Sequence, residues 1–135
     1  MIFVLGLFLA FADLAAVKAE PDPEKRSEAA LDFANDAIDQ ARAGYGSGDL
    51  ARTQAALTAV RESVELSYDS LRASGKKPRK SKYYKHAEQK IHAMVRRLDA
   101  LRDAMALEDR LAVEATIKKL QDINEEVLSD VMTKK

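Results

Sequence analysis

The sequence predicts an all-α protein, an antiparallel four-helix bundle made of two helical hairpins. Three observations support this fold class. The 135 residues are 47% hydrophobic and 33% charged, with only five glycines and three prolines, which is typical of helix-rich proteins. Apolar residues recur every three or four positions in four stretches. Glycine and proline clusters, or a shift of the apolar pattern, separate these stretches. Because cysteine is absent, helix packing has to stabilise the fold.

An apolar run of twelve residues, MIFVLGLFLAFA, opens the chain and is followed by the charged residues Asp13 and Lys18. The run is shorter than the roughly 20 residues that a membrane-spanning helix needs. Val17 and Ala19 place small residues at the positions that a signal peptidase recognises. We therefore predict a signal peptide over residues 1–19 and an exported protein, periplasmic or secreted. An N-terminal helix packed on the core and a retained membrane anchor are the alternatives.

The first helix of the predicted mature domain, residues 20–135, should begin near Pro23. Asp22 can accept a hydrogen bond from a backbone N–H of the first turn, and proline at the first helical position sacrifices no hydrogen bond. Three glycines between Gly44 and Gly48 should end this helix. Its apolar stripe comprises Leu31, Ala34, Ile38, Ala41 and Tyr45.

The second helix should begin after Asp49, a plausible cap, and end at Ser74 and Gly75. Because the loop between the first two helices is short, they should be antiparallel neighbours. The apolar stripe of the second helix comprises Thr53, Leu57, Val60, Val64, Tyr68 and Leu71.

From Ser81 to the C-terminus there is neither glycine nor proline, so one continuous helix has to be considered. The apolar pattern argues against it, because its phase slips by about one residue near residues 106–108. We predict a turn there, with Glu108 and Asp109 at the start of a fourth helix. The two apolar stripes are Ile91, Met94, Leu98, Leu101 and Met105, and then Val113, Ile117, Leu120, Asn124, Val127 and Val131.

The two halves align at an offset of about sixty residues, pairing Leu31 with Ile91 and Asp49 with Asp109. Duplication of a hairpin and accidental similarity both explain this match. The predicted bundle thus consists of a hairpin over residues 23–74, a basic linker over 75–80 and a second hairpin over 81–133.

Charge is divided unevenly between the halves of the mature chain. Residues 20–75 carry eleven acidic and six basic side chains, a net charge of −5, and residues 76–135 carry fifteen basic and ten acidic ones, a net charge of +5. The two hairpins could attract each other within one bundle, or the positive half could face an anionic partner.

The densest positive feature is the basic segment, which we define as Lys76 to Lys85, where six of ten residues are basic. It could bind phosphates, acidic polysaccharide or anionic lipid, or it could be a solvated joint whose tyrosines pack on the bundle. Nucleic acid is not expected, because no recognition motif accompanies the segment. The candidate residues for binding an anionic surface are Lys76, Lys77, Arg79, Lys80, Lys82, Tyr83, Tyr84 and Lys85.

Metal, cofactor and catalytic sites are not predicted. His86 and His92, six residues apart, point about 120° apart around a helix and cannot share a metal ion as an i, i+4 pair would. Met94 and Met105 fall on an apolar stripe, where methionine fills a core. No cysteine nucleophile, G-x-S-x-G or glycine-rich phosphate loop is present. An acidic row that could attract cations comprises Glu28, Asp32, Asp36 and Asp39.

These observations favour an exported, non-enzymatic helical-bundle protein that acts as an interaction or scaffold module, through a protein partner or by self-association. Two alternatives stay open: a bundle that holds a metal ion or haem in the cell envelope, and a weak electrostatic binder of anionic lipid or polysaccharide.

Overall fold

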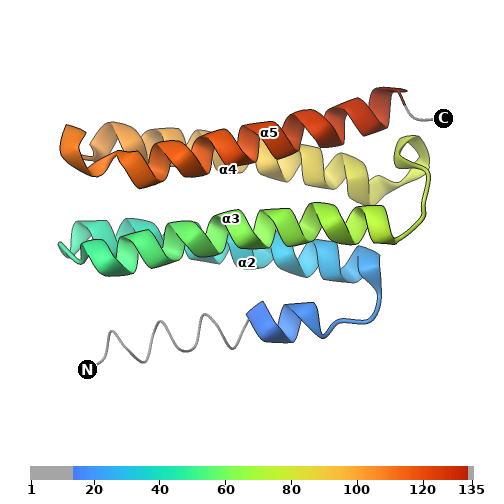
Figure 1. Ribbon diagram of the computed structural model, residues 1–135, viewed down its shortest axis with the longest axis horizontal. Helices are drawn as coiled ribbons and strands as arrows, with labels where there is room; N and C mark the ends of the chain where they lie inside the picture. The colour runs from blue at the N-terminus through green and yellow to red at the C-terminus, as the bar shows by residue number, and fades with distance from the viewer. Residues whose placement is uncertain (1–13, 134–135) are drawn as a thin grey trace.

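The computed structural model describes residues 14–133, and within them four long helices pack against each other (Figure 1). Residues 14–18, which precede the first of these, are also helical. The predicted all-helical fold class is therefore confirmed. The long helices are α2 (Pro23–Gly46), α3 (Leu50–Ala73), α4 (Lys82–Ala104) and α5 (Leu111–Thr133), and two 3₁₀ turns, η1 (Pro78–Lys80) and η2 (Leu107–Asp109), lie in the last two connections.

The predicted helix starts are capped as expected. The Asp22 carboxylate accepts the backbone N–H of Glu24 at 2.9 Å, with Pro23 as the first helical residue. The Asp49 carboxylate accepts the N–H of Arg52 at 3.0 Å at the start of α3. Gly48, with φ 77°, supplies the left-handed backbone of the turn between α2 and α3.

The turn predicted near residues 106–108 is confirmed, although α5 begins at Leu111 rather than at Glu108. Asp109 has a different role from the predicted one, since its carboxylate accepts the Tyr45 hydroxyl at 2.9 Å. The Tyr45 hydroxyl in turn accepts the backbone N–H of Ala106 at 2.9 Å. These two bonds tie the end of α2 to the turn that precedes α5.

The predicted antiparallel arrangement holds for consecutive long helices. It is wrong across the two hairpins, where the helices that face each other run in parallel (Figure 1). Ion pairs show the register of this interface, which we call the seam. Asp32 pairs with Lys90, and Asp39 with Arg97, and both pairs are 58 residues apart in the chain. A constant offset along two helices requires parallel axes. Consequently α2 packs beside α4, α3 packs beside α5, and the connection from α3 to α4 crosses the end of the bundle diagonally.

The closest helix contact lies between α2 and α3, and small side chains line it. At one end the hydroxyls of Ser27 and Ser67 are 2.8 Å apart. At the other end, a Cβ atom on Gly44 would lie 3.0 Å from the Thr53 hydroxyl oxygen. Small residues allow two helix backbones to approach closely. The buried small residues are Ser27, Ala30, Ala34, Ala37, Ala41 and Gly44 on α2, and Thr53, Ala56, Ser63, Ser67 and Ser70 on α3.

Large apolar side chains form one continuous core between the hairpins. All six residues that the apolar stripes place most centrally are buried, and Met94 and Met105 are buried with them, as expected for core methionines. The six are Leu57, Val60, Leu98, Leu101, Ile117 and Leu120.

A buried polar pair joins α3 to the end of α5. The Tyr68 hydroxyl donates to the Asp130 carboxylate at 2.6 Å, and both residues are less than a tenth exposed. Burial raises the pKa of Tyr68 above its ordinary value, and the hydrogen bond to Asp130 raises it further. Burial, followed by the charge of Asp130, also raises the pKa of Tyr84.

The apolar run over residues 1–12 lies outside the described residues, so the signal peptide stays a prediction, as does the duplication. Leu14 is buried, but it does not belong to the main core cluster. The segment 14–18 lies beside α2 (Figure 1). Within residues 14–133, no helix combines the length and the apolar character needed to cross a membrane.

We expect Gly44→Ala and Gly46→Ala to change stability in opposite directions. An alanine Cβ at position 46 meets nothing within 4 Å, so better helix propensity should stabilise the fold by about 0.5–1 kcal/mol. A Cβ at position 44 would press on the Thr53 hydroxyl and backbone, so that variant should lose about 1–3 kcal/mol. Urea unfolding of both variants measures the difference. Equal effects would show that α2 and α3 are not in close contact at Gly44.

We expect the fold to lose stability above about pH 10, and Tyr68→Phe to reduce that loss. A tyrosine whose pKa is raised in the folded state keeps its proton there while the unfolded chain releases its own. The contribution of Tyr68 to the free energy of unfolding is therefore complete below pH 10 and declines as the pH rises further. At pH 8 the variant should be about 1.5–3 kcal/mol less stable, because it lacks the hydrogen bond to Asp130.

Urea unfolding at pH 8 and at pH 11 measures both effects, with Tyr83→Phe as the matched control. If wild type and Tyr68→Phe lose the same free energy of unfolding between these two pH values, Tyr68 does not cause the alkaline sensitivity.

Candidate anion-binding surface

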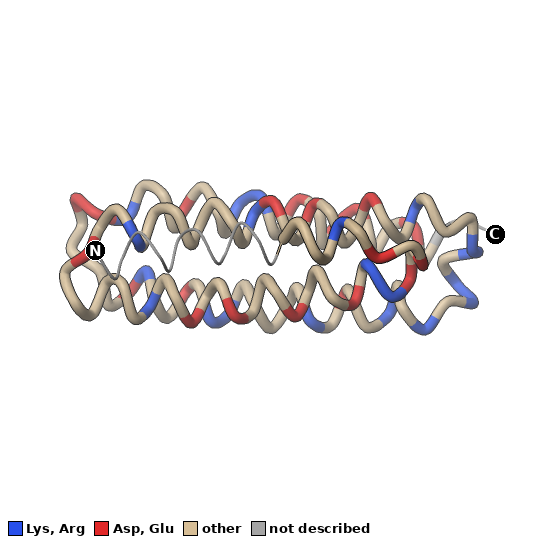
Figure 2. Tube along the Cα trace, turned by 90° about the horizontal axis from the view of Figure 1, so that it is seen from below, with Lys and Arg blue, Asp and Glu red and all other residues tan. Residues whose placement is uncertain are grey.

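The basic segment forms the diagonal connection between α3 and α4. Gly75, with φ 69°, ends α3 in the left-handed conformation, and the η1 turn follows. Pro78, Ser81 and Tyr84 are buried and fix the segment on the bundle end. All six basic residues of the segment are exposed. Figure 2 shows lysine and arginine positions gathered at this end of the bundle, where α5 ends.

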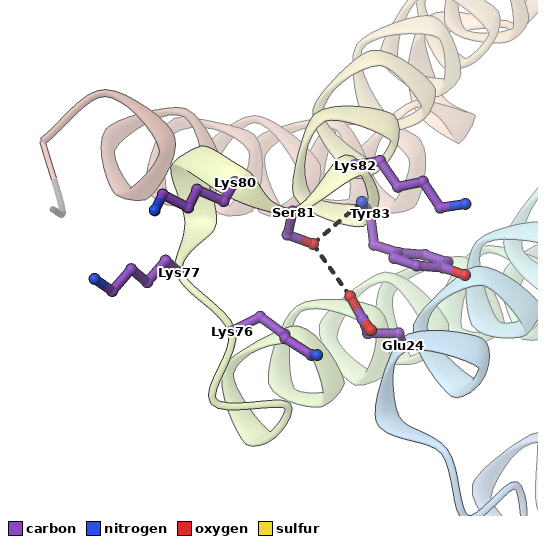
Figure 3. Close-up of a pocket in the computed structure, with 7 residues that line it drawn as sticks. All are labelled: Glu24, Lys76, Lys77, Lys80, Ser81, Lys82 and Tyr83. Carbon is purple, nitrogen blue, oxygen red and sulfur yellow. Dashed lines mark hydrogen bonds between the residues drawn. The ribbon is translucent and has the colours of Figure 1, made fainter.

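Ser81 joins the start of α4 to α2. Its hydroxyl oxygen accepts the backbone N–H of Tyr83 at 3.2 Å, which caps the helix, and its hydroxyl group donates to the Glu24 carboxylate at 3.3 Å (Figure 3). This arrangement holds the lysines on both sides of Ser81 at one place on the surface. The first turn of α4 contains no acidic side chain, so the positive end of its helix dipole adds to the charge of the lysines.

An open pocket of about 360 Å³ lies between this segment and α2 (Figure 3). Four lysines and one glutamate line it, and Figure 3 shows the Lys77 and Lys80 side chains extending away from Ser81 and Glu24. The pocket therefore lies in a region of positive charge that favours an oxyanion such as a phosphate, sulfate or carboxylate group, although the ammonium groups do not converge on one point. The lining residues are Glu24, Lys76, Lys77, Lys80, Ser81, Lys82 and Tyr83.

The two tyrosines of the segment have different environments. Tyr84 is 3% exposed and belongs to the core, so its ring anchors the segment and does not face solvent. Tyr83 is partly buried and lines the pocket, and the Lys82 ammonium lies 5.3 Å from the centre of its ring. Arg79 and Lys85 are exposed but lie outside the pocket lining.

Ionic contacts distinguish the basic segment from the rest of the positive half. Within residues 14–133, none of its six basic side chains takes part in an ion pair. At the seam, by contrast, Lys90 and Arg97 pair with α2, and Lys119 pairs with Glu65 of α3 at 3.2 Å. The attraction between the hairpins therefore operates at the seam and does not use the basic segment.

The other candidate residues lie on outer faces of the bundle. His86 and His92 are exposed on α4. The acidic row of α2 is exposed as well, and two of its members, Asp32 and Asp39, form the seam ion pairs. In the part of the chain that the structure describes, no three histidine or carboxylate side chains cluster in a way that could hold a metal ion.

Sequence reasoning did not identify two residues of the pocket, Glu24 and Ser81. A serine directly before a helix is a readable cap signal, so Ser81 could have been found. Glu24 lies 57 residues earlier, and only the parallel packing of α2 and α4 brings it to the pocket.

The fold and this surface define an all-helical bundle with a basic end. Comparisons with models of protein families, with curated proteins and with solved structures gave no match.

Proposed function

We propose that the protein is an exported, non-enzymatic interaction module that binds an anionic surface through the basic segment. The observation that carries this proposal is the set of six exposed cations that make no ion pair within residues 14–133. Three buried residues, Pro78, Ser81 and Tyr84, hold the segment in place. Its charges are therefore available to a partner without disturbing the core.

The interaction is electrostatic and depends on salt. Each basic residue near an anionic surface contributes on the order of 1 kcal/mol. Added salt shortens the screening length from about 10 Å at 0.1 M to about 3 Å at 1 M. The affinity should therefore fall steeply over this range.

Export by a cleaved signal peptide is part of the proposal. The apolar run and the small residues Val17 and Ala19 support it. Two observations support cleavage after Ala19: α2 begins at Pro23 with its own cap, Asp22, and none of residues 14–30 belongs to the main core cluster.

We expect replacement of Lys76, Lys77, Arg79 and Lys80 by Gln to abolish binding to anionic partners while the melting temperature stays nearly unchanged. All four side chains are exposed and make no ion pair within residues 14–133, so their loss removes charge without removing packing. Titration against phosphatidylglycerol vesicles and against polygalacturonate, at 0.1 M and 1 M salt, measures the effect.

The matched control replaces Arg42, Arg52, Arg110 and Lys118 by Gln, which removes the same charge from the part of the bundle nearer the opposite end. This control should bind as wild type does, apart from a small effect of net charge. Equal weakening of both variants, or no binding by wild type at 0.1 M salt, would contradict the proposal.

We expect the exported protein to begin at Glu20 and to keep the stability of a longer chain that begins at Leu14, because Leu14 lies outside the core cluster. Intact-mass measurement of protein recovered from the cell envelope or medium identifies the first residue. Thermal unfolding of the two chains compares their stability. A protein that stays in the cytoplasm and begins at Met1 would rule out the predicted export.

A further inference from the structure

Positive charge extends beyond the basic segment along α4. From Lys76 to Arg97 the chain carries nine lysine or arginine residues and a single acid, Glu88. Two of the nine, Lys90 and Arg97, are paired with α2 at the seam. The other seven make no ion pair within the described residues.

The outer face of α4 is a narrow polar stripe. Its exposed residues between Lys82 and Arg96 are spaced one or three positions apart. They therefore share one face of the helix, opposite the buried Ile91 and Met94. At 1.5 Å per residue the stripe is about 21 Å long, and the basic segment continues it around the end of the bundle. The exposed residues are Lys82, Lys85, His86, Gln89, His92, Ala93 and Arg96.

Acidic side chains border this stripe on the side of α2. The pairs of Asp32 with Lys90 and of Asp39 with Arg97 show that the acidic row of α2 runs beside α4. The row also contains Glu28 and Asp36, which are exposed. A broad anionic surface would bring negative charge close to this row, well within the screening length of about 10 Å at 0.1 M salt. A narrow anionic chain lying along α4 would meet the basic stripe alone.

The composition of the stripe also argues against two other anionic partners, a lipid surface and single-stranded nucleic acid. It carries no exposed large apolar side chain of the kind that a helix inserts into a lipid interface. Single-stranded nucleic acid is bound by stacking its bases on open aromatic rings. Tyr84 is in the core, and Tyr83 is partly buried beside Lys82, so this surface offers at most one ring, too few to stack successive bases.

From these observations we infer that the anionic partner is a linear acidic polysaccharide that lies along α4 from the basic segment to Arg96. Such a chain carries carboxylate or sulfate groups along its length, and some of these can meet Lys82, Lys85 and Arg96, the three lysine and arginine residues of the stripe. The pocket beside Ser81 receives one of these anionic groups, and the stripe extends the contact. This inference rests on the proposed function and adds the class of partner and its direction on the surface.

The test uses oligogalacturonates of defined length with the whole protein from Glu20 and with the double variant Lys85→Gln/Arg96→Gln. Wild-type affinity should rise with oligomer length until the oligomer spans both the basic segment and α4. The variant should bind long oligomers about twenty-five-fold more weakly, since each of the two lost cations near an anion is worth on the order of fivefold. Its affinity for the shortest oligomers should fall by a smaller factor, because Lys85 belongs to the basic segment but Arg96 lies beyond it.

A second readout is the salt dependence. The slope of the logarithm of affinity against the logarithm of salt concentration reports the number of charge contacts, so it should be shallower for the variant with long oligomers. The control Arg42→Gln/Lys118→Gln removes the same charge outside the stripe and should keep the wild-type slope. Thermal unfolding should show the same melting temperature for all three proteins.

Two results would overturn the inference and leave the proposed function standing. In the first, the affinity for oligogalacturonates depends neither on their length nor on Lys85 and Arg96. In the second, the protein binds phosphatidylglycerol vesicles or oligothymidylate more tightly than long oligogalacturonates. If wild type binds none of these probes at 0.1 M salt, both the inference and the proposed function are wrong.

Discussion

The close approach of α2 and α3 determines how the rest of the bundle is arranged. Alanine, serine and glycine line this contact, so the two backbones pack tightly and leave little room between them for large side chains. The large side chains, such as Leu57 and Ile38, face the second hairpin and form the common core with it. The first hairpin therefore presents one apolar face, which α4 and α5 cover side by side. Because α4 lies beside α2 and α5 beside α3, the neighbouring helices at the seam are parallel (Figure 1).

Parallel packing also explains how the unequal charges of the two halves are used. Acidic residues of the first hairpin and basic residues of the second meet at the seam, as in the pairs of Asp32 with Lys90 and of Glu65 with Lys119. These side chains are partly exposed, so each pair is worth at most about 1 kcal/mol. They also favour the observed register of the seam, since a shifted register would separate the paired charges. The basic segment lies beyond the last of these acids and keeps its charge available.

Patterns within one helix could be read from the sequence, whereas relations between helices could not. Caps such as Asp22 and Asp49, and the turn after Met105, follow from local rules about hydrogen bonding and apolar phase. The serines of α3 were not expected in the interior, because a stripe of large apolar residues says nothing about a second, tightly packed face. Likewise Lys76 to Lys85 could be recognised as a basic segment, but the place of Glu24 in the pocket depends on which helices are neighbours, and no local rule determines that.

The diagonal connection between α3 and α4 separates the requirements of folding from those of binding. Helix axes about 8–10 Å apart put diagonal helices roughly 11–14 Å apart, so a connection of two or three residues would have to be almost fully extended to join them. The chain must carry several solvent-facing positions there, whatever its activity. Only Pro78 and Ser81 within the connection are buried. The remaining positions can change their side chains with little effect on the fold, so the architecture maintains at one end of the molecule a region where new binding specificities can evolve independently of stability.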